Sequence, residues 1–123
     1  MIKIKNKNDL EAMRIAGKKT AIILKKVAEK VSPGVTTKDL DAYAADLAKD
    51  EGGRCAFYGY HGFSGHICAS VNEEIVHGVP GNRVIHDGDI VSIDFGLVYN
   101  NFIGDTAITV AAGSISSEWQ ALL

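Results

Sequence analysis

The spacing of apolar residues in the first half of the chain predicts two amphipathic helices. From residue 10 to residue 28, apolar or small residues recur every three or four positions, which is the repeat of a helix with one buried side. These positions are Leu10, Met13, Gly17, Ala21, Leu24 and Ala28. A second stripe of the same kind consists of Leu40, Tyr43, Ala44 and Leu47.

Polar residues at the ends of the two stripes predict where the helices begin and end. Asn8-Asp9-Leu10-Glu11 resembles a capping box with Asn in place of Ser. Thr36-Thr37-Lys38-Asp39 is expected to open the second helix. Ser32-Pro33-Gly34 is expected to stop the first helix. Glu51-Gly52-Gly53 is expected to end the second, because glycine readily adopts the left-handed conformation of a helix cap.

After residue 53 the pattern changes to short runs rich in β-branched and aromatic residues, the composition of strands. The runs at 55–58, 67–71, 90–97 and 102–110 are predicted strands. Two helices followed by a small antiparallel sheet form an α+β fold, and 123 residues suffice for one such domain. We therefore expect a single α+β unit over residues 1–123.

The last residues predict the start of a third helix. Ser114, Ser116 and Ser117 are typical of helix starts, and residues 118–123 continue with a helical pattern. A helix of about seven residues is marginal without packing partners. We therefore expect this chain to be the beginning of a longer polypeptide.

Composition indicates a globular protein without a membrane span. The hydrophobic share is 46%, and no apolar run approaches the ~18 residues of a spanning helix. The amino terminus carries lysines but no apolar segment of a secretory signal. The two cysteines, Cys55 and Cys68, match no zinc motif and are expected to be reduced and buried. A cytoplasmic location follows as an expectation.

Charge is unevenly distributed although the net charge is only −2. Residues 1–30 contain nine basic and three acidic residues, a balance of +6, while the remainder contains four basic and twelve acidic residues, a balance of −8. The basic helix could face nucleic acid or an acidic partner, or could simply be a solvated surface. The acidic remainder suits a site for metal ions or amines.

Asp94 and Asp105 are the strongest candidates for chemistry. Each lies in a predicted strand, and between them Asn100-Asn101 tolerates the positive φ angles of a tight hairpin turn. If the loop has an even number of residues, Asp94 lies opposite Ala107, and Asp105 is its diagonal neighbour on the same face. A loop with an odd number of residues would place the carboxylates on opposite faces of the sheet, unless a β-bulge shifted one strand by a residue. Two carboxylates on one buried face must share a proton or hold a cation, and hard divalent metals prefer oxygen ligands. Solvated strand positions are the alternative.

Between residues 58 and 106 the sequence contains a set of specific motifs. In chain order they are Tyr58-Gly59-Tyr60-His61-Gly62-Phe63, Asn72-Glu73-Glu74-Ile75-Val76-His77-Gly78-Val79-Pro80, Asp87-Gly88-Asp89, the strand that ends at Asp94, and Gly104-Asp105-Thr106. Together they resemble the amino-terminal half of type I methionine aminopeptidases, from about residue 4 to residue 123. That family has the pita-bread fold, in which two pseudo-symmetric α+β halves enclose a site with two metal ions.

The resemblance implies a role for several residues. It places Asp94 and Asp105 among five metal ligands, and the other three, a histidine and two glutamates, belong to the second half of the fold, which this chain lacks. His77 is implied to contact the substrate amide and stabilise the tetrahedral intermediate, although such a histidine could also be a structural turn residue. His66 and His86 are expected on the surface. The residues implied to line the substrate pocket are Phe57, Tyr60, His61, Phe63, Cys68 and His77, and simple core packing is the alternative for the apolar ones.

The implied function is metal-dependent removal of the initiator methionine from nascent proteins. Divalent metals (Co, Mn, Fe, Zn or Ni), two in a complete site, would activate water and polarise the scissile carbonyl. Because three ligands are missing, a truncated half is expected to be weakly active or inactive alone. Two alternatives stay open: a homodimer of half-enzymes that brings together two copies of Asp94 and Asp105, and a non-catalytic binding module. The implied partners are amino-terminal peptides of nascent proteins, the ribosome through the basic helix, and either a second copy or a missing second half.

Overall fold

The computed structural model describes residues 2–123, which form three helices, one short 3-10 helix and one antiparallel sheet. The long helices are α1 (Lys7–Glu29) and α2 (Thr37–Asp50), and the 3-10 helix η1 spans Tyr60–Gly62. The strands are β1 (Arg54–Cys55), β2 (Cys68–Val71), β3 (Ile90–Tyr99) and β4 (Phe102–Ala111), and α3 (Ser117–Gln120) follows. The expected order of two helices and then an antiparallel sheet is confirmed.

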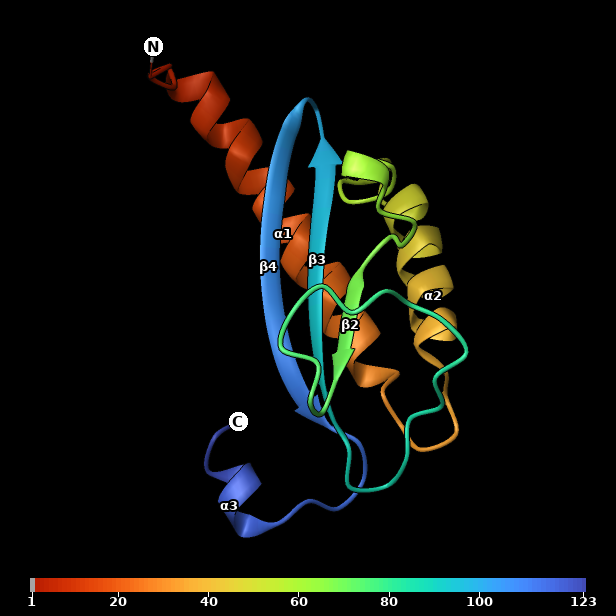
Figure 1. Ribbon diagram of the computed structural model, residues 1–123. Helices are drawn as coiled ribbons and strands as arrows, with labels where there is room; N and C mark the ends of the chain where they lie inside the picture. Colours follow the sequence, from red (N-terminus) through yellow and green to blue (C-terminus); the bar gives the residue numbers. More distant parts are fainter. Residues whose placement is uncertain (1) are drawn as a thin grey trace.

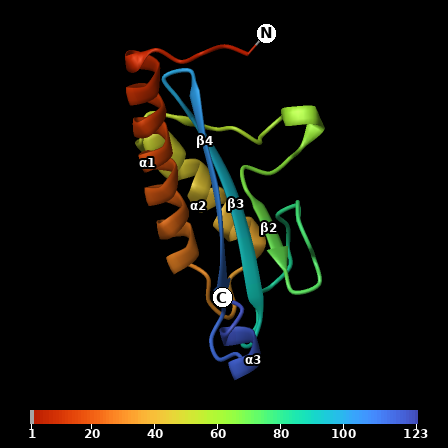
Figure 2. The same cartoon turned by 90° about the vertical axis from the view of Figure 1, so that its left-hand side faces the viewer.

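Strand β3 is the centre of the sheet. It pairs with β4 along one side over its full length and with β2 and β1 along the other, always antiparallel. Both long helices cover the same face of the sheet, and the loops on either side of β2 lie over the opposite face (Figures 1 and 2). The side chains of β3 alternate accordingly, with Val91, Ile93, Phe95 and Leu97 fully buried toward the helices. The opposite face of β3 is therefore left for the site.

The predicted buried side of the first helix is wrong. In α1 the buried residues are Ala16, Thr20, Ile23, Leu24 and Val27. Of the predicted stripe only Leu24 is buried; Leu10, Met13 and Ala21 are exposed. Apolar residues occur on more than one side of α1, since Ile15 and Ile22 are exposed, and the buried side also includes Thr20, whose hydroxyl donates to the Ala16 carbonyl at 2.7 Å and is thereby satisfied inside the core. Spacing alone does not decide between two such stripes, and a pattern that counts only apolar residues passes over Thr20.

The helix limits agree with the sequence in part. The N-cap of the first helix lies two residues before the predicted one: it is Asn6, which forms a reciprocal capping box with Asp9. The second helix begins where predicted, with Thr36 as N-cap in a capping box with Asp39. Of its predicted stripe, Leu40, Ala44 and Leu47 are buried and Tyr43 is partly buried. The short α3 also forms where expected, with Ser116 as its N-cap. Within residues 2–123 no helix combines the length and the apolar character needed to cross a bilayer.

Three of the four predicted strands are confirmed within two residues. The run 55–58 is mostly not a strand: only Arg54 and Cys55 pair with β3, and the aromatic residues that follow lie in a loop. Their composition reflects the lining of a cavity and not a pleated sheet. The hairpin between β3 and β4 turns on Asn100 and Asn101, with φ of 47° and 65°, and positive φ at both central residues defines a type I′ turn.

Close contact between α1 and β4 depends on Gly104. A Cβ at this position would clash with the Thr20 hydroxyl and lie 2.9 Å from the Ala16 carbonyl oxygen. We expect Gly104→Ala to lower the free energy of unfolding by about 1–3 kcal/mol, the usual cost of overpacking. Gly17→Ala is the matched control because a Cβ there meets nothing within 4 Å. That change should stabilise the helix by about 0.5–1 kcal/mol. Urea unfolding followed by circular dichroism measures both, and equal midpoints for the two variants would contradict the packing described here.

Candidate metal centre and adjoining cavity

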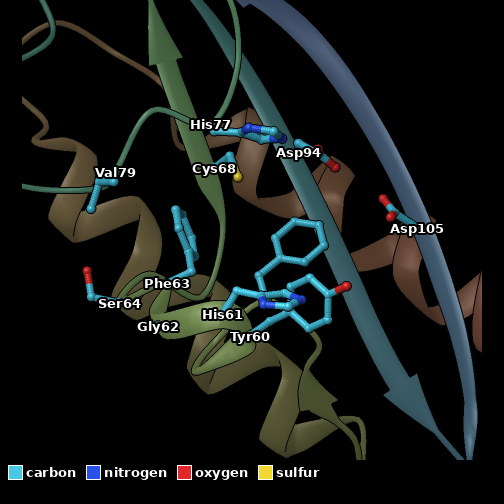
Figure 3. A pocket seen from close by; sticks show the side chains of 11 residues that line it. Tyr60, His61, Gly62, Phe63, Ser64, Cys68, His77, Val79, Asp94 and Asp105 are labelled. Atoms are coloured by element: carbon cyan, nitrogen blue, oxygen red, sulfur yellow. The ribbon is translucent and has the colours of Figure 1, made fainter.

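The β3–β4 hairpin brings Asp94 and Asp105 to one face of the sheet. Asp94 pairs with Ala107 and Gly96 pairs with Asp105, so the two aspartates are diagonal neighbours, as the even two-residue turn predicted. Leu97 and Gly104, which form the next pair along the hairpin, face α1. Because side chains alternate along a strand, both carboxylates point away from the helices (Figure 3).

The electrostatics of Asp94 show that this pair is uncompensated. Burial raises the pKa of the Asp94 carboxyl to about 6, with the charge and a hydrogen bond of Asp105 acting in the same direction and the neighbouring His77 opposing them. Within residues 2–123 neither carboxylate belongs to any of the six ion pairs. Two like charges without a cationic partner on a partly buried face fit a divalent metal, which takes hard oxygen ligands.

The described residues supply only part of a metal coordination sphere. Across residues 2–123 there is no group of three or more His, Cys, Asp or Glu side chains that could hold a metal ion. Protein metal sites with a catalytic role commonly have three or more protein ligands. A complete site therefore needs ligands beyond Asp94 and Asp105.

Next to the carboxylates lies a cavity of about 560 Å³. All eight residues singled out from the sequence line it: Phe57, Tyr60, His61, Phe63, Cys68, His77, Asp94 and Asp105. The structure thus gathers residues from the loop after β1, from β2, from the loop before β3 and from the hairpin (Figure 3).

Three lining residues were missed from the sequence: Gly62, Ser64 and Val79. Each is next to a residue that was singled out or within the same motif, so proximity in the chain was the available signal. Val79 is 58% exposed and adds an apolar group at the mouth of the cavity.

The aromatic wall of the cavity depends on a glycine in β3. A Cβ at Gly96 would lie 2.8 Å from Cε1 of Phe57, so the absence of a side chain lets the Phe57 ring lie against the sheet. The Tyr60 and His61 rings meet edge to face with their centroids 4.4 Å apart. Apolar and aromatic surface therefore adjoins the two carboxylates directly.

Cys68 is an apolar lining group and not a reactive thiol. It is 5% exposed and pairs with Asp94 across the sheet. Burial raises its thiol pKa to about 11, and the charges of Asp94 and Asp105 act in the same direction. The thiol is therefore protonated at neutral pH, and neither nucleophilic attack nor thiolate ligation of a metal is expected of it.

The other two histidines lie outside this cavity. The expected surface position is confirmed for His86, whose side chain is 76% exposed. His66 is partly buried instead: its Nδ1 lies 2.8 Å from Asp41, and its ring stacks on Tyr58 with centroids 4.5 Å apart. The sequence could not indicate this partner, because Asp41 lies in α2, 25 residues earlier.

Comparison with known proteins is consistent with this geometry. Residues 11–123 match metallopeptidase family M24, and the chain belongs to that family. It is 46% identical to methionine aminopeptidase 1 of Bacillus subtilis over 123 residues, which are 100% of this chain and 50% of that protein. It is also 46% identical to a methionine aminopeptidase of Clostridium acetobutylicum. The chain spans about half the length of these relatives.

Solved structures give the same result. The crystal structure of methionine aminopeptidase from Rickettsia prowazekii superposes with a TM-score of 0.96 at 33% identity, over 99% of this chain and 49% of that one. The enzyme from Thermotoga maritima gives a TM-score of 0.94 at 39% identity, over 99% and 49%. Prolidase from Pyrococcus furiosus, at 24% identity and a TM-score of 0.83, shares the fold. The expected architecture, one half of the pita-bread fold, is confirmed.

The carboxylate pair predicts an effect on stability in the metal-free protein. Between the ordinary Asp pKa of about 3.9 and the Asp94 value of about 6, the folded state binds the proton more tightly than the unfolded state. Stability contributed by this group is therefore lost as pH rises through that window. We expect Asp94→Asn to be more stable than the parent at pH 7.5, by about 1 kcal/mol after allowance for solvent screening.

Thermal unfolding at pH 4 and pH 7.5 in the presence of a chelator measures this effect. The advantage of the variant should shrink at pH 4, where the Asp94 carboxyl is largely protonated in the folded state. Asp46→Asn, which changes an exposed carboxyl of α2, serves as the control. An Asp94→Asn variant that is less stable than the parent at pH 7.5 would contradict the repulsion between the carboxylates of Asp94 and Asp105.

Proposed function

We propose that this chain is the metal-binding amino-terminal half of a methionine aminopeptidase, a hydrolase that removes the initiator methionine from nascent proteins. The observation that carries the proposal is the convergence of Asp94 and Asp105 on one sheet face, beside an apolar cavity that His77 also lines. The similarity to proteins named methionine aminopeptidase supports the choice of substrate. A cytoplasmic location goes with it, because nascent chains emerge there.

Asp94 and Asp105 are the residues that would hold the metal ions. When bound, divalent ions supply a water nucleophile at neutral pH and polarise the scissile carbonyl. The net negative character of this face would also hold the free α-amine of the substrate. His77 would donate a hydrogen bond to the oxygen that becomes negatively charged during attack.

The cavity would take the methionine side chain. Its walls are two phenylalanines, a tyrosine and the protonated thiol of Cys68. A flexible, polarisable thioether packs well against aromatic rings and sulfur. The volume of about 560 Å³ lies in the usual range of small-molecule sites.

The chain by itself is expected to be weakly active or inactive. It contributes two carboxylates, and the further ligands would come from a second half of the fold or from a second copy of the chain. The comparisons do not favour a homodimeric half-enzyme or a non-catalytic module, because the relatives that match over the whole chain are named as aminopeptidases.

The exposed lysines of α1 would contact the ribosome. Lys18, Lys25 and Lys26 are exposed on this helix. Lys19 and Arg14 are already engaged with Glu51 and Glu11. Binding to ribosomal RNA that weakens steeply with added salt would support this contact.

Metal binding tests the carboxylate pair. Titration of Mn²⁺ at pH 7.5 by isothermal calorimetry should detect binding to the chain, and both Asp94→Asn and Asp105→Asn should weaken it at least about tenfold, since each removes one of two anionic ligands. Asp46→Asn should bind as the parent does. Equal affinity of parent and Asp94→Asn would contradict the site.

The pH dependence of metal binding follows from the raised pKa of Asp94. Because the pKa of this carboxyl is about 6, the metal must displace a proton below that pH. We expect the apparent affinity to fall by about tenfold per pH unit below pH 6 and to level off above pH 7. A constant affinity between pH 5 and pH 7 would show that Asp94 is not a ligand.

Hydrolysis tests the catalytic part of the proposal. Release of methionine from Met-Ala-Ser should be at or below the detection limit for the chain with Mn²⁺ or Co²⁺. It should appear when the second half of a close relative is added and should depend on Asp94. Analytical ultracentrifugation of the same samples distinguishes a hetero-pair from a homodimer. Full activity of the monomeric chain alone would refute the division of ligands between two halves.

A further inference from the structure

The backbone of His77 adopts a conformation that needs external support. Its φ is 57°, in the left-handed region that residues other than glycine seldom occupy. Such conformations persist when the surrounding contacts hold them, and they cluster at functional sites. The ring of His77 nevertheless reaches over the sheet toward Asp94 (Figure 3). Something must therefore fix the segment that carries it.

The support comes from the next residue, Gly78, whose carbonyl oxygen and N–H each form a hydrogen bond with β2. Its carbonyl oxygen accepts a hydrogen bond from the Ala69 N–H at 2.9 Å. Its own N–H donates to the Ser70 hydroxyl at 3.0 Å. Only the second bond involves a side chain, so Ser70 is the residue whose substitution would weaken the contact between Gly78 and β2.

The contact between Gly78 and β2 leaves no room for adjustment. Gly78 is buried, and a Cβ on it would clash with the Ala69 carbonyl group and lie 2.9 Å from the Ser70 Cα. Ser70 is itself only 4% exposed. Without its hydroxyl, the buried Gly78 N–H has no acceptor and no access to water, which favours release of the segment.

Ser70 bonds to the loop of His77, whereas the residues beside it across the sheet, Ser92 and Thr109, do not. Its cross-strand partner is Ser92, and the Ser92 hydroxyl bonds to Thr109 at 2.8 Å, within the sheet. Other side-chain anchors of the loop lie three or more residues from His77: the Glu74 carboxylate, which accepts from the Val71 N–H, the ion pairs of Arg83 with Glu73 and Glu74, and the bonds between Thr37 and Gly81. Ser70 is therefore the side-chain anchor adjacent to His77.

We propose that Ser70 is a positioning residue, whose hydroxyl holds the His77–Gly78 segment so that the His77 ring stays beside the Asp94–Asp105 carboxylates. This inference rests on the proposed metal site. Ser70 need not touch substrate or metal; it acts through Gly78 on the orientation of His77.

The test uses NMR spectroscopy of the whole chain, with Mn²⁺ alone as the probe. Bound Mn²⁺ broadens signals of nearby protons, and the effect falls steeply with distance. In the parent, Mn²⁺ should broaden the His77 ring signals together with the Phe95 and Thr106 amides, which adjoin the two carboxylates. In Ser70→Ala, broadening of the two amides should persist and that of the ring should decrease severalfold. In the metal-free variant, hydrogen exchange of the Gly78 amide should be about tenfold faster.

Ser92→Ala is the matched control, because it removes a hydroxyl from the same row without contact to Gly78. It should leave both readouts at the parent values. If Ser70→Ala does not fold, Ser70→Cys keeps the site filled with a slightly larger group and replaces the oxygen with a weak acceptor, and the same changes are expected.

The outcomes separate the two proposals. Unchanged ring broadening in a folded Ser70 variant whose amides are still broadened overturns the positioning role alone. Unchanged exchange of the Gly78 amide overturns the anchor. Absence of broadening at Phe95 and Thr106 in the parent overturns the proposed metal site itself.

Discussion

The repulsion between Asp94 and Asp105 is the constraint on which the rest of the site depends. The two-residue turn at Asn100 and Asn101 fixes the register of β3 and β4, and the register places both carboxylates on the face away from the helices. A slip of one residue would turn one of them into the core. The fold therefore holds two like charges at close range, and a divalent cation bound between them would offset their repulsion.

Glycines and backbone contacts bring the other groups to this pair. Gly104 lets α1 lie close to β4, Gly96 lets the Phe57 ring lie on the sheet, and Gly78 lets the loop of His77 dock on β2. Each close approach excludes a side chain that would push an element of the site outward. The position of the cavity next to the carboxylates follows from these contacts together.

Much of the site was predictable because it depends on local chain geometry. Strand alternation and an even turn at Asn100-Asn101 predicted the pairing of Asp94 with Ala107. The resemblance to methionine aminopeptidases implied six further lining residues but not Gly62, Ser64 and Val79. Three features depend on tertiary contacts that the sequence pattern does not show: the side of α1 that packs on the sheet, the pairing of His66 with Asp41, and the loop that replaces the predicted strand at 55–58. The Thr20 hydroxyl is satisfied by a carbonyl of its own helix, whereas His66 pairs with a residue 25 positions earlier and Phe57 packs against Gly96 of β3.

The most direct test of the central claim is a crystal structure of the chain grown with Mn²⁺ at pH 7.5, with data collected at an energy where manganese scatters anomalously. The account predicts an anomalous peak between the carboxylates of Asp94 and Asp105, at about 2.0–2.2 Å from oxygens of both. A peak confined to another part of the molecule, or carboxylates turned apart with no peak between them, would contradict it.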